Sequence, residues 1–126
     1  MKAISIWQPH ASLIIGGIKR YETRSWPAPH SLVGQRIAIH AAKKTDDLKE
    51  LTEYISEDDD GGPVDPVWEA FRHALKGMGF VNSMEMPRGC LLGTAILSAS
   101  LPTVIIAAPG AFGAFSPGRF TWPLRV

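Results

Sequence analysis

The sequence predicts an α+β domain in which short strands close into a small β-barrel, with one N-terminal helix and a helical insertion. Two observations support this fold class. Alternating apolar residues mark strands at both ends of the chain, while both longer helical patterns fall in one stretch, at about residues 44–85. Turn residues separate the strands, and a final strand can return to pair with the earlier ones. With 126 residues, 45% of them hydrophobic, the chain is expected to form one domain, residues 1–126.

The N-terminal third is expected to contain three strands and one helix. Ile4 and Ile6 alternate with polar residues, which predicts a first strand over residues 2–7. Pro9 suits the first turn of a helix that ends at Gly16 and Gly17. Further strands are expected at about residues 20–26 and 36–40.

The rest of the chain is expected to contain the insertion and the remaining strands. Apolar residues at helical spacing predict two amphipathic helices, separated by an acidic, glycine-containing turn. The predicted helices cover residues 44–59 and 66–75, and the predicted strands cover about 90–101, 103–107 and 120–126.

Charge is distributed unevenly along the chain, although the net charge is only +1. Residues 1–45 sum to +6, residues 46–70 to −9 and residues 71–126 to +4. This pattern favours a basic working surface and an insertion with a different purpose, although the acidic residues themselves fit a solvated helix face better. The low net charge argues against a protein that coats nucleic acid broadly.

Several classes of protein are not expected. A single cysteine, Cys90, allows no internal disulfide, and the sequence shows neither a signal-peptide pattern nor an apolar run long enough for a membrane span. We therefore expect a cytoplasmic protein without a membrane association. The spacing of the histidines does not match a metal site, so no metal or cofactor is expected. They are His10, His30, His40 and His73.

The segment from Gly17 to Arg24 is the most informative about function, because two cations and a carboxylate come together there. In a strand, Glu22 and Arg24 share one face, and Lys19 joins them only if the chain turns before the strand. Such a group suits a phosphate or the polar edge of a base. A purely structural ion-pair cluster fits the same residues equally well. Lys19, at a turn, is expected to be dispensable for packing.

The pattern Gly17-x-Lys19-x-x-Glu22-x-Arg24 resembles the signature of the ASCH domain family. Other segments resemble the family in the same order along the chain, so that the resemblance covers nearly everything except residues 44–85. They are Ser5–Ile14, Gly34–Ala41, Pro87–Gly93 and Gly113–Trp122.

The resemblance implies a PUA-like β-barrel, a family associated with RNA, and a cleft lined by Lys19, Glu22 and Arg24. Some small ASCH proteins are amidohydrolases that deacetylate N-acetylated cytidine with a lysine, a threonine three residues later and a remote glutamate. Lys19 matches that lysine, but Glu22 occupies the threonine position. The remote glutamate is not placed by the resemblance, and Glu85 is a candidate for it by position only. Ribonuclease activity, also associated with the family, is neither supported nor excluded by this motif.

Four further residues are candidates for ligand contact. Trp7 and Trp26 lie at strand ends near the motif, where either ring would stack on a base or pack in the core. His40 ends a strand beside two lysines, and Arg119 follows a turn that would aim it over a barrel mouth. Each has a structural alternative, as a satisfied histidine or a surface arginine. Trp68 and Trp122 are expected to pack in the interior.

Three functions are compatible with the sequence. The leading hypothesis is binding of RNA, of another single-stranded nucleic acid or of a modified nucleoside. The second is a hydrolase in which Lys19 acts as base or activator and Glu22 as proton shuttle. The third is a protein-interaction module that uses the acidic insertion. The sequence names neither the base nor the oligomeric state.

Overall fold

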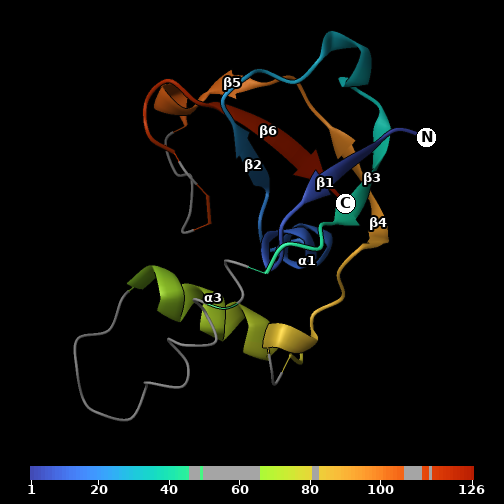
Figure 1. Cartoon of the computed structure of the whole chain (residues 1–126). Helices are drawn as coiled ribbons and strands as arrows, with labels where there is room; N and C mark the ends of the chain where they lie inside the picture. Colours follow the sequence, from blue (N-terminus) through green and yellow to red (C-terminus); the bar gives the residue numbers. More distant parts are fainter. Residues whose placement is uncertain (46–48, 50–65, 81–82, 107–111, 114) are drawn as a thin grey trace.

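A six-stranded mixed sheet and two α-helices form the described part of the chain (Figure 1). The computed structural model describes residues 1–45, 49, 66–80, 83–106, 112–113 and 115–126. The strand order is β1-β3-β4-β6-β2, and β5 pairs with β6. The strands are β1 (Ala3–Ile6), β2 (Tyr21–Arg24), β3 (Arg36–Ala41), β4 (Cys90–Leu97), β5 (Leu101–Pro102) and β6 (Phe120–Arg125). The α+β prediction is confirmed.

The alternating pattern of the strands buries one continuous apolar core. β1 runs parallel to β3, with Ile4 opposite Ile39, while β3–β4, β4–β6 and β6–β2 are antiparallel pairs. Ile37 and Ile39 of β3 are fully buried and pack with Ile14 of α1 (His10–Ile15). The sheet therefore provides a rigid base for α1 and for the residues on either side of it.

The sheet is not closed into the predicted barrel. β1 and β2 lie at the two ends of the strand order, and the described residues form no backbone ladder between them. Instead, the guanidinium of Arg24 in β2 donates to the backbone oxygen of Ser5 in β1, with 2.9 Å between Nη2 and O. A pattern of alternating residues predicts strands but not which edges pair, so closure could not be read from it.

Helix α1 is held at both ends by specific contacts. The buried amide of Gln8 accepts from the Ser12 backbone nitrogen at 3.0 Å and donates to the Pro87 oxygen at 2.8 Å, which ties the start of α1 to a distant turn. At its other end, Gly17 has a φ of 76°, and the backbone nitrogens of Ile18 and Lys19 both donate to the Leu13 oxygen. A glycine suits this left-handed ending, which reverses the chain toward β2.

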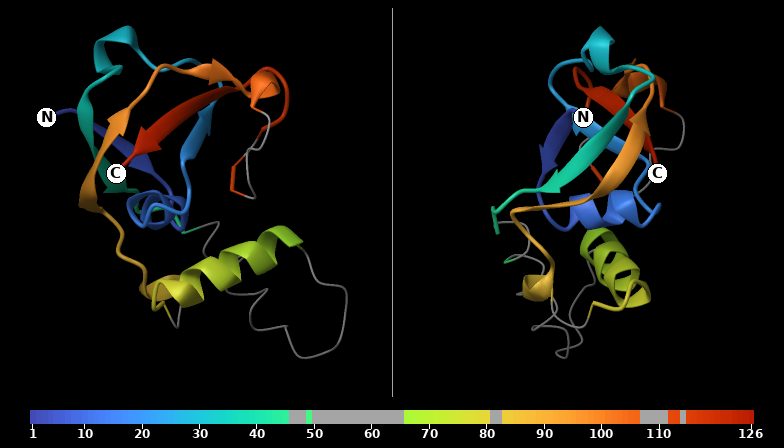
Figure 2. Two further views of the ribbon diagram at one scale, coloured as in Figure 1. Left: turned by 180° about the vertical axis from the view of Figure 1, so that it is seen from behind. Right: turned by 90° about the vertical axis from the view of Figure 1, so that its right-hand side faces the viewer.

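The helix predicted over residues 66–75 is confirmed as α3 (Pro66–Gly77). Its Phe71 and Leu75 pack against Leu13 of α1 and against Met86, in a core separate from that of the sheet. Figure 2 shows α1 lying between the sheet and α3. The first predicted helix, over residues 44–59, lies almost wholly outside the described residues, as does the acidic turn after it.

The strand predicted at residues 103–107 is wrong over its described part. Residues 103–105 instead form a 3₁₀ turn, η3 (Thr103–Ile105). The Thr103 hydroxyl donates to the Ser116 oxygen at 2.8 Å, and its backbone nitrogen donates to the Arg119 oxygen at 3.0 Å. These contacts compete with a ladder. Two other short 3₁₀ turns are η1 (His30–Leu32) and η2 (Ser83–Glu85). Within the described chain, no helix has the length and apolar character needed to cross a bilayer.

Candidate functional site

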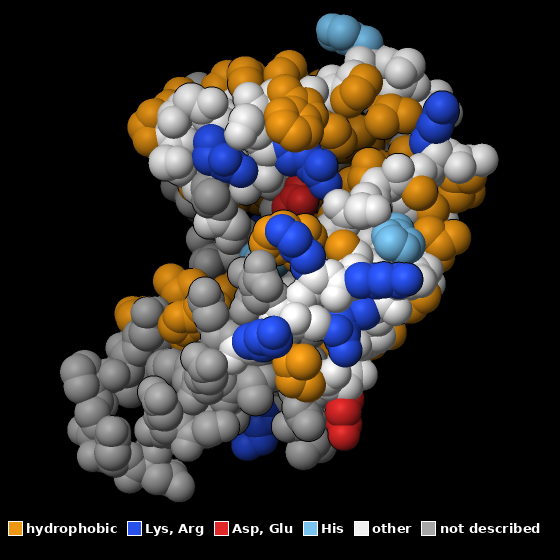
Figure 3. Space-filling view, in the orientation of Figure 1, with side chains coloured by type: hydrophobic (Ala, Val, Ile, Leu, Met, Phe, Trp, Pro, Cys, Tyr) orange, Lys and Arg blue, Asp and Glu red, His pale blue; other side chains and the backbone are white. Residues whose placement is uncertain are grey.

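A pocket of about 720 Å³ lies where the open sheet meets α3. The edges of β1 and β2 contribute Trp7 and Glu22–Trp26, the start of α1 contributes His10, and α3 contributes Trp68. Figure 3 shows the concave face, with blue lysine and arginine side chains grouped near a red carboxylate. The volume of the pocket is typical of sites for small organic ligands.

Lys19 is the most deeply placed charged residue of the pocket. Only 3% of it is exposed, and its Nζ lies 2.8 Å from Nδ1 of His10 and 3.5 Å from Oε1 of Glu22. The left-handed turn at Gly17 sends Lys19 back toward the start of α1, before β2 begins. Lys19 thereby joins Glu22 despite its strand parity. The expectation that Lys19 is dispensable for packing is wrong, because its side chain is buried among these partners.

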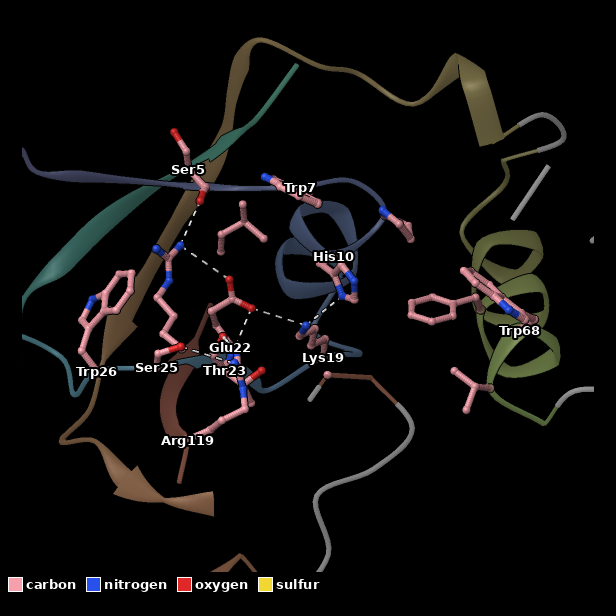
Figure 4. Close-up of a pocket in the computed structure, with 16 residues that line it drawn as sticks. Ser5, Trp7, His10, Lys19, Glu22, Thr23, Ser25, Trp26, Trp68 and Arg119 are labelled. Carbon is pink, nitrogen blue, oxygen red and sulfur yellow. Dashed lines mark hydrogen bonds and ion pairs between the residues drawn. The ribbon is translucent and has the colours of Figure 1, made fainter. Parts of the chain in front are cut away.

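Glu22 connects the two cations of the motif (Figure 4). Its Oε1 faces Lys19 and accepts from the Thr23 backbone nitrogen at 3.2 Å, while its Oε2 lies 3.6 Å from Nη2 of Arg24. The carboxylate side chain is only 13% exposed. The predicted convergence of Lys19, Glu22 and Arg24 is therefore found, as a partly buried ion-pair cluster.

Arg24 is held by three different contacts. Besides Glu22 and the Ser5 oxygen, its guanidinium lies over the ring of Trp122, 5.1 Å from the centroid. Trp122 is buried, as expected, and its Nε1 donates to the Trp26 backbone oxygen at 3.0 Å. The Nε of Arg24 is buried without a hydrogen-bond partner. A buried donor left unpaired is costly, although the aromatic face offsets part of that cost.

Two tryptophan side chains at the pocket are accessible to solvent. Trp7 is 40% exposed and Trp26 is 56% exposed, and both line the pocket. The ammonium of Lys44 lies over the Trp7 ring at 4.1 Å. The hydrogen bond from Trp122 fixes the backbone of Trp26 while leaving its ring outside the core. Rings in such positions are available to stack on a planar ligand.

The structure separates the remaining candidates. Arg119 lines the pocket, and its Nη2 donates to the Thr23 oxygen at 3.1 Å. His40 lies on the neighbouring strand β3, where its Nδ1 is 2.9 Å from the Ser5 hydroxyl, and it does not line the pocket. Glu85, in η2, is exposed and is not among the residues that line the pocket.

The pocket residues that sequence reasoning missed include three with rings, namely His10, Trp68 and Phe71. The Nδ1 of His10 is hydrogen-bonded to Nζ of Lys19, and the His10 ring packs edge-to-face against the Phe71 ring, with centroids 5.4 Å apart. The hydrophobic pattern of α3 showed that Trp68 and Phe71 face the protein, but not that they border a pocket.

The arrangement combines accessible aromatic rings with a buried charged cluster. Three cations, Lys19, Arg24 and Arg119, accompany one carboxylate, Glu22, among the described lining residues. The cluster is suited to hydrogen-bonding the polar edge of a planar group while the rings contact its faces. No group of three histidine, cysteine or acidic residues arranged for a metal ion was found in the described ranges.

Comparison with known proteins identifies the family. The model of the ASCH domain matches residues 4–99, which include all but the first residue of β1, the elements from there to β4, and the whole Lys19–Glu22–Arg24 cluster. Activating signal cointegrator 1 from Homo sapiens and its counterpart from Mus musculus are each 34% identical to the chain over 90 residues. The match covers 71% of this chain but only 13% of each relative. The match to the family model over most of its length shows that the chain belongs to the ASCH domain family.

Proposed function

We propose that the pocket binds a nucleobase, presented by a nucleoside, a modified nucleoside or single-stranded RNA. The observation that carries the proposal is that exposed Trp7 and Trp26 line the same pocket as the Lys19–Glu22–Arg24 cluster. Stacking on aromatic rings and hydrogen bonding to base edges are the two interactions by which proteins read unpaired bases. Membership of a family associated with RNA supports the same function.

The open edge of the sheet gives the base a route into the pocket. Between β1 and β2 the described residues form the hydrogen bond from the Arg24 side chain to the Ser5 backbone oxygen, and not a backbone ladder. A planar group that enters there therefore has to displace side chains but not a pair of bonded strands. Family membership supports a PUA-like arrangement in which the six strands are the counterpart of the barrel wall. On this view the helical insertion adds α3 as an outer wall of the pocket.

The hydrolase alternative has one observation in its favour. The Nζ of Lys19 lies 2.8 Å from His10 and 3.5 Å from Glu22, an arrangement through which a proton can move. Amide hydrolysis also needs an attacking group, and a carboxylate occupies the position where related amidohydrolases carry a threonine. Binding without turnover is therefore the function that this pocket supports best.

Calorimetric titration with nucleosides and short single-stranded RNA tests the proposal. Trp26→Ala and Trp7→Ala should each weaken binding by about 5- to 100-fold, the effect of losing one base–aromatic stack. The matched control is Leu101→Ala, because Leu101 is similarly exposed, at 41%, but does not line the pocket. Equal affinities for wild type and both tryptophan variants would contradict the proposal, as would the absence of any binding.

A further inference from the structure

The pocket extends well beyond the charged cluster, to a second aromatic region on α3. Trp26 and Trp68 both line it, and Figure 4 shows them on opposite sides of Lys19 and Glu22. Trp7 lies nearer to the charged pair. The proposed base-binding site uses the end of the pocket that contains Trp7 and Trp26. At the other end, α3 serves only as an outer wall and has no ligand contact assigned to it.

The α3 end of the pocket is not fully explained by packing. Phe71 and Leu75 are buried and supply the contact with α1, through Leu13. Trp68 and Val67 lie one turn closer to the helix start, where Trp68 is only partly buried and Val67 is 47% exposed. The Trp68 ring contacts Phe71, with centroids 5.6 Å apart and planes inclined by 41°. A large apolar surface is thus supported from behind and open to the pocket.

The order of these groups matches the chemistry of a single strand. In a single-stranded nucleic acid, the flat faces of successive bases are spaced by a polar, anionic sugar-phosphate backbone. The pocket alternates in the same way, with tryptophan at one end, a cluster of mainly cationic residues in the middle and tryptophan at the other end. Aromatic platforms on either side of a cationic path are typical of proteins that bind unpaired strands.

We infer that Trp68, with Val67 beside it, forms a second base subsite, so that the ligand is a dinucleotide step of single-stranded RNA rather than one nucleoside. The inference rests on the proposed function and extends it. One base occupies the end near Trp26 and Trp7, the link passes the partly exposed side chains of Arg24 and Arg119, and the neighbouring base stacks on Trp68. Specificity for the second base is then set by α3.

The test compares ligands that differ by one nucleoside. Each common ribonucleoside is titrated as its 3′- and 5′-methyl phosphate, beside every dinucleoside monophosphate built from them. These ligands carry the same single phosphodiester charge, so their affinity ratio reports the second nucleoside, and the Trp68 variants isolate the part of that ratio that comes from stacking of its base. In wild type the best dinucleotide should bind about 5- to 100-fold tighter than its one-base counterpart. In Trp68→Ala that ratio should fall to near one, and Trp68→Phe should restore part of it.

Trp26→Ala is the matched comparison, since it should weaken both ligands and leave the ratio largely unchanged. A wild-type affinity ratio of dinucleotide to one-base ligand near one overturns the second subsite, whether or not Trp68→Ala folds. A folded Trp68→Ala protein that keeps the wild-type ratio overturns it as well. In both cases binding of the one-base ligands still supports the proposed function. If neither class of ligand binds, the proposed function itself fails, and the second subsite fails with it.

Discussion

Removal of the Lys19 charge is the perturbation whose cost the structure specifies best. The side chain is almost completely buried beside His10 and Glu22. We choose Lys19→Met, which keeps an unbranched apolar stem and deletes the ammonium. Glu22 then loses one of its two cations, and Nδ1 of His10 loses its donor. Both losses leave a polar group less well paired than before, and such groups are costly when they are withdrawn from water.

The expected cost follows from the geometry. Breaking a fully buried ion pair costs about 3–5 kcal/mol, and a hydrogen bond to a charged group is worth about 1.5–3 kcal/mol. Glu22 keeps Arg24 at 3.6 Å and is 13% exposed, so the loss should lie below the full ion-pair value. We expect the free energy of unfolding to fall by about 2–4 kcal/mol. For a domain of this size the melting temperature should fall by roughly 6–20 °C.

A double-mutant cycle separates the ion pair from other effects. Glu22→Gln alone should also destabilise, because it leaves Lys19 buried without its carboxylate. Combined with Lys19→Met, it should cost about 1–3 kcal/mol less than the sum of the single changes. Thermal and urea unfolding measure all three variants, with the exposed Lys2→Met as control, expected within about 0.5 kcal/mol of wild type. Additive single effects, or a Lys19→Met protein as stable as wild type, would refute the reasoning.

Three other predictions concern the turns, the acidic insertion and catalysis. Gly89→Ala should lower the free energy of unfolding by about 1–2 kcal/mol, because the φ of Gly89 is +67° and an added Cβ would lie 3.0 Å from the Lys43 side chain. Gly77→Ala should raise it by about 0.5–1 kcal/mol, because Gly77 lies in a helix and an added Cβ would meet nothing within 4 Å. Thermal unfolding measures both. Changing the three aspartates at 58–60 to asparagine should strengthen nonspecific RNA binding, most clearly at low salt; an affinity unchanged across a salt series contradicts a role near the pocket. N-acetylcytidine should be bound but deacetylated slowly or not at all, and chromatography showing fast release of cytidine, abolished by Lys19→Ala, would prove this wrong.

The extent to which the site was predictable depends on the distance in sequence between its parts. Lys19, Glu22 and Arg24 lie within six residues, so strand alternation and one glycine turn were enough to bring them together. His10 reaches Lys19 only because α1 and the turn after it bring the chain back by one helix length. Trp68 reaches the pocket by tertiary packing of α3, which periodicity along one helix does not encode.

The fold shows the same division. Local patterns gave β1, α1, β2, β3 and α3 in the right places. They gave a strand at Thr103 where side-chain hydrogen bonds to the Ser116 and Arg119 oxygens hold a 3₁₀ turn instead. They also favoured a closed barrel, which is not found. Pairing between β1 and β2, the two end strands of the sheet, depends on long-range geometry that local patterns do not contain. The sheet is open between Ser5 and Arg24, at the place where the prediction of a closed barrel failed. Both residues line the candidate site, so this opening is the feature of the sheet that says most about function.

The central claim is that a base enters the pocket between the open edges of β1 and β2, and nitrogen–proton correlation spectra test it most directly. Titration with the tightest-binding nucleoside should shift the indole signals of Trp7 and Trp26 and the Nε signal of Arg24 most strongly. The indole of Trp122, which donates to the Trp26 oxygen, should shift less. Saturable shifts confined to these residues are the predicted result. Shifts that map to β4 or β5, or spectra unchanged at saturating ligand, would contradict the claim.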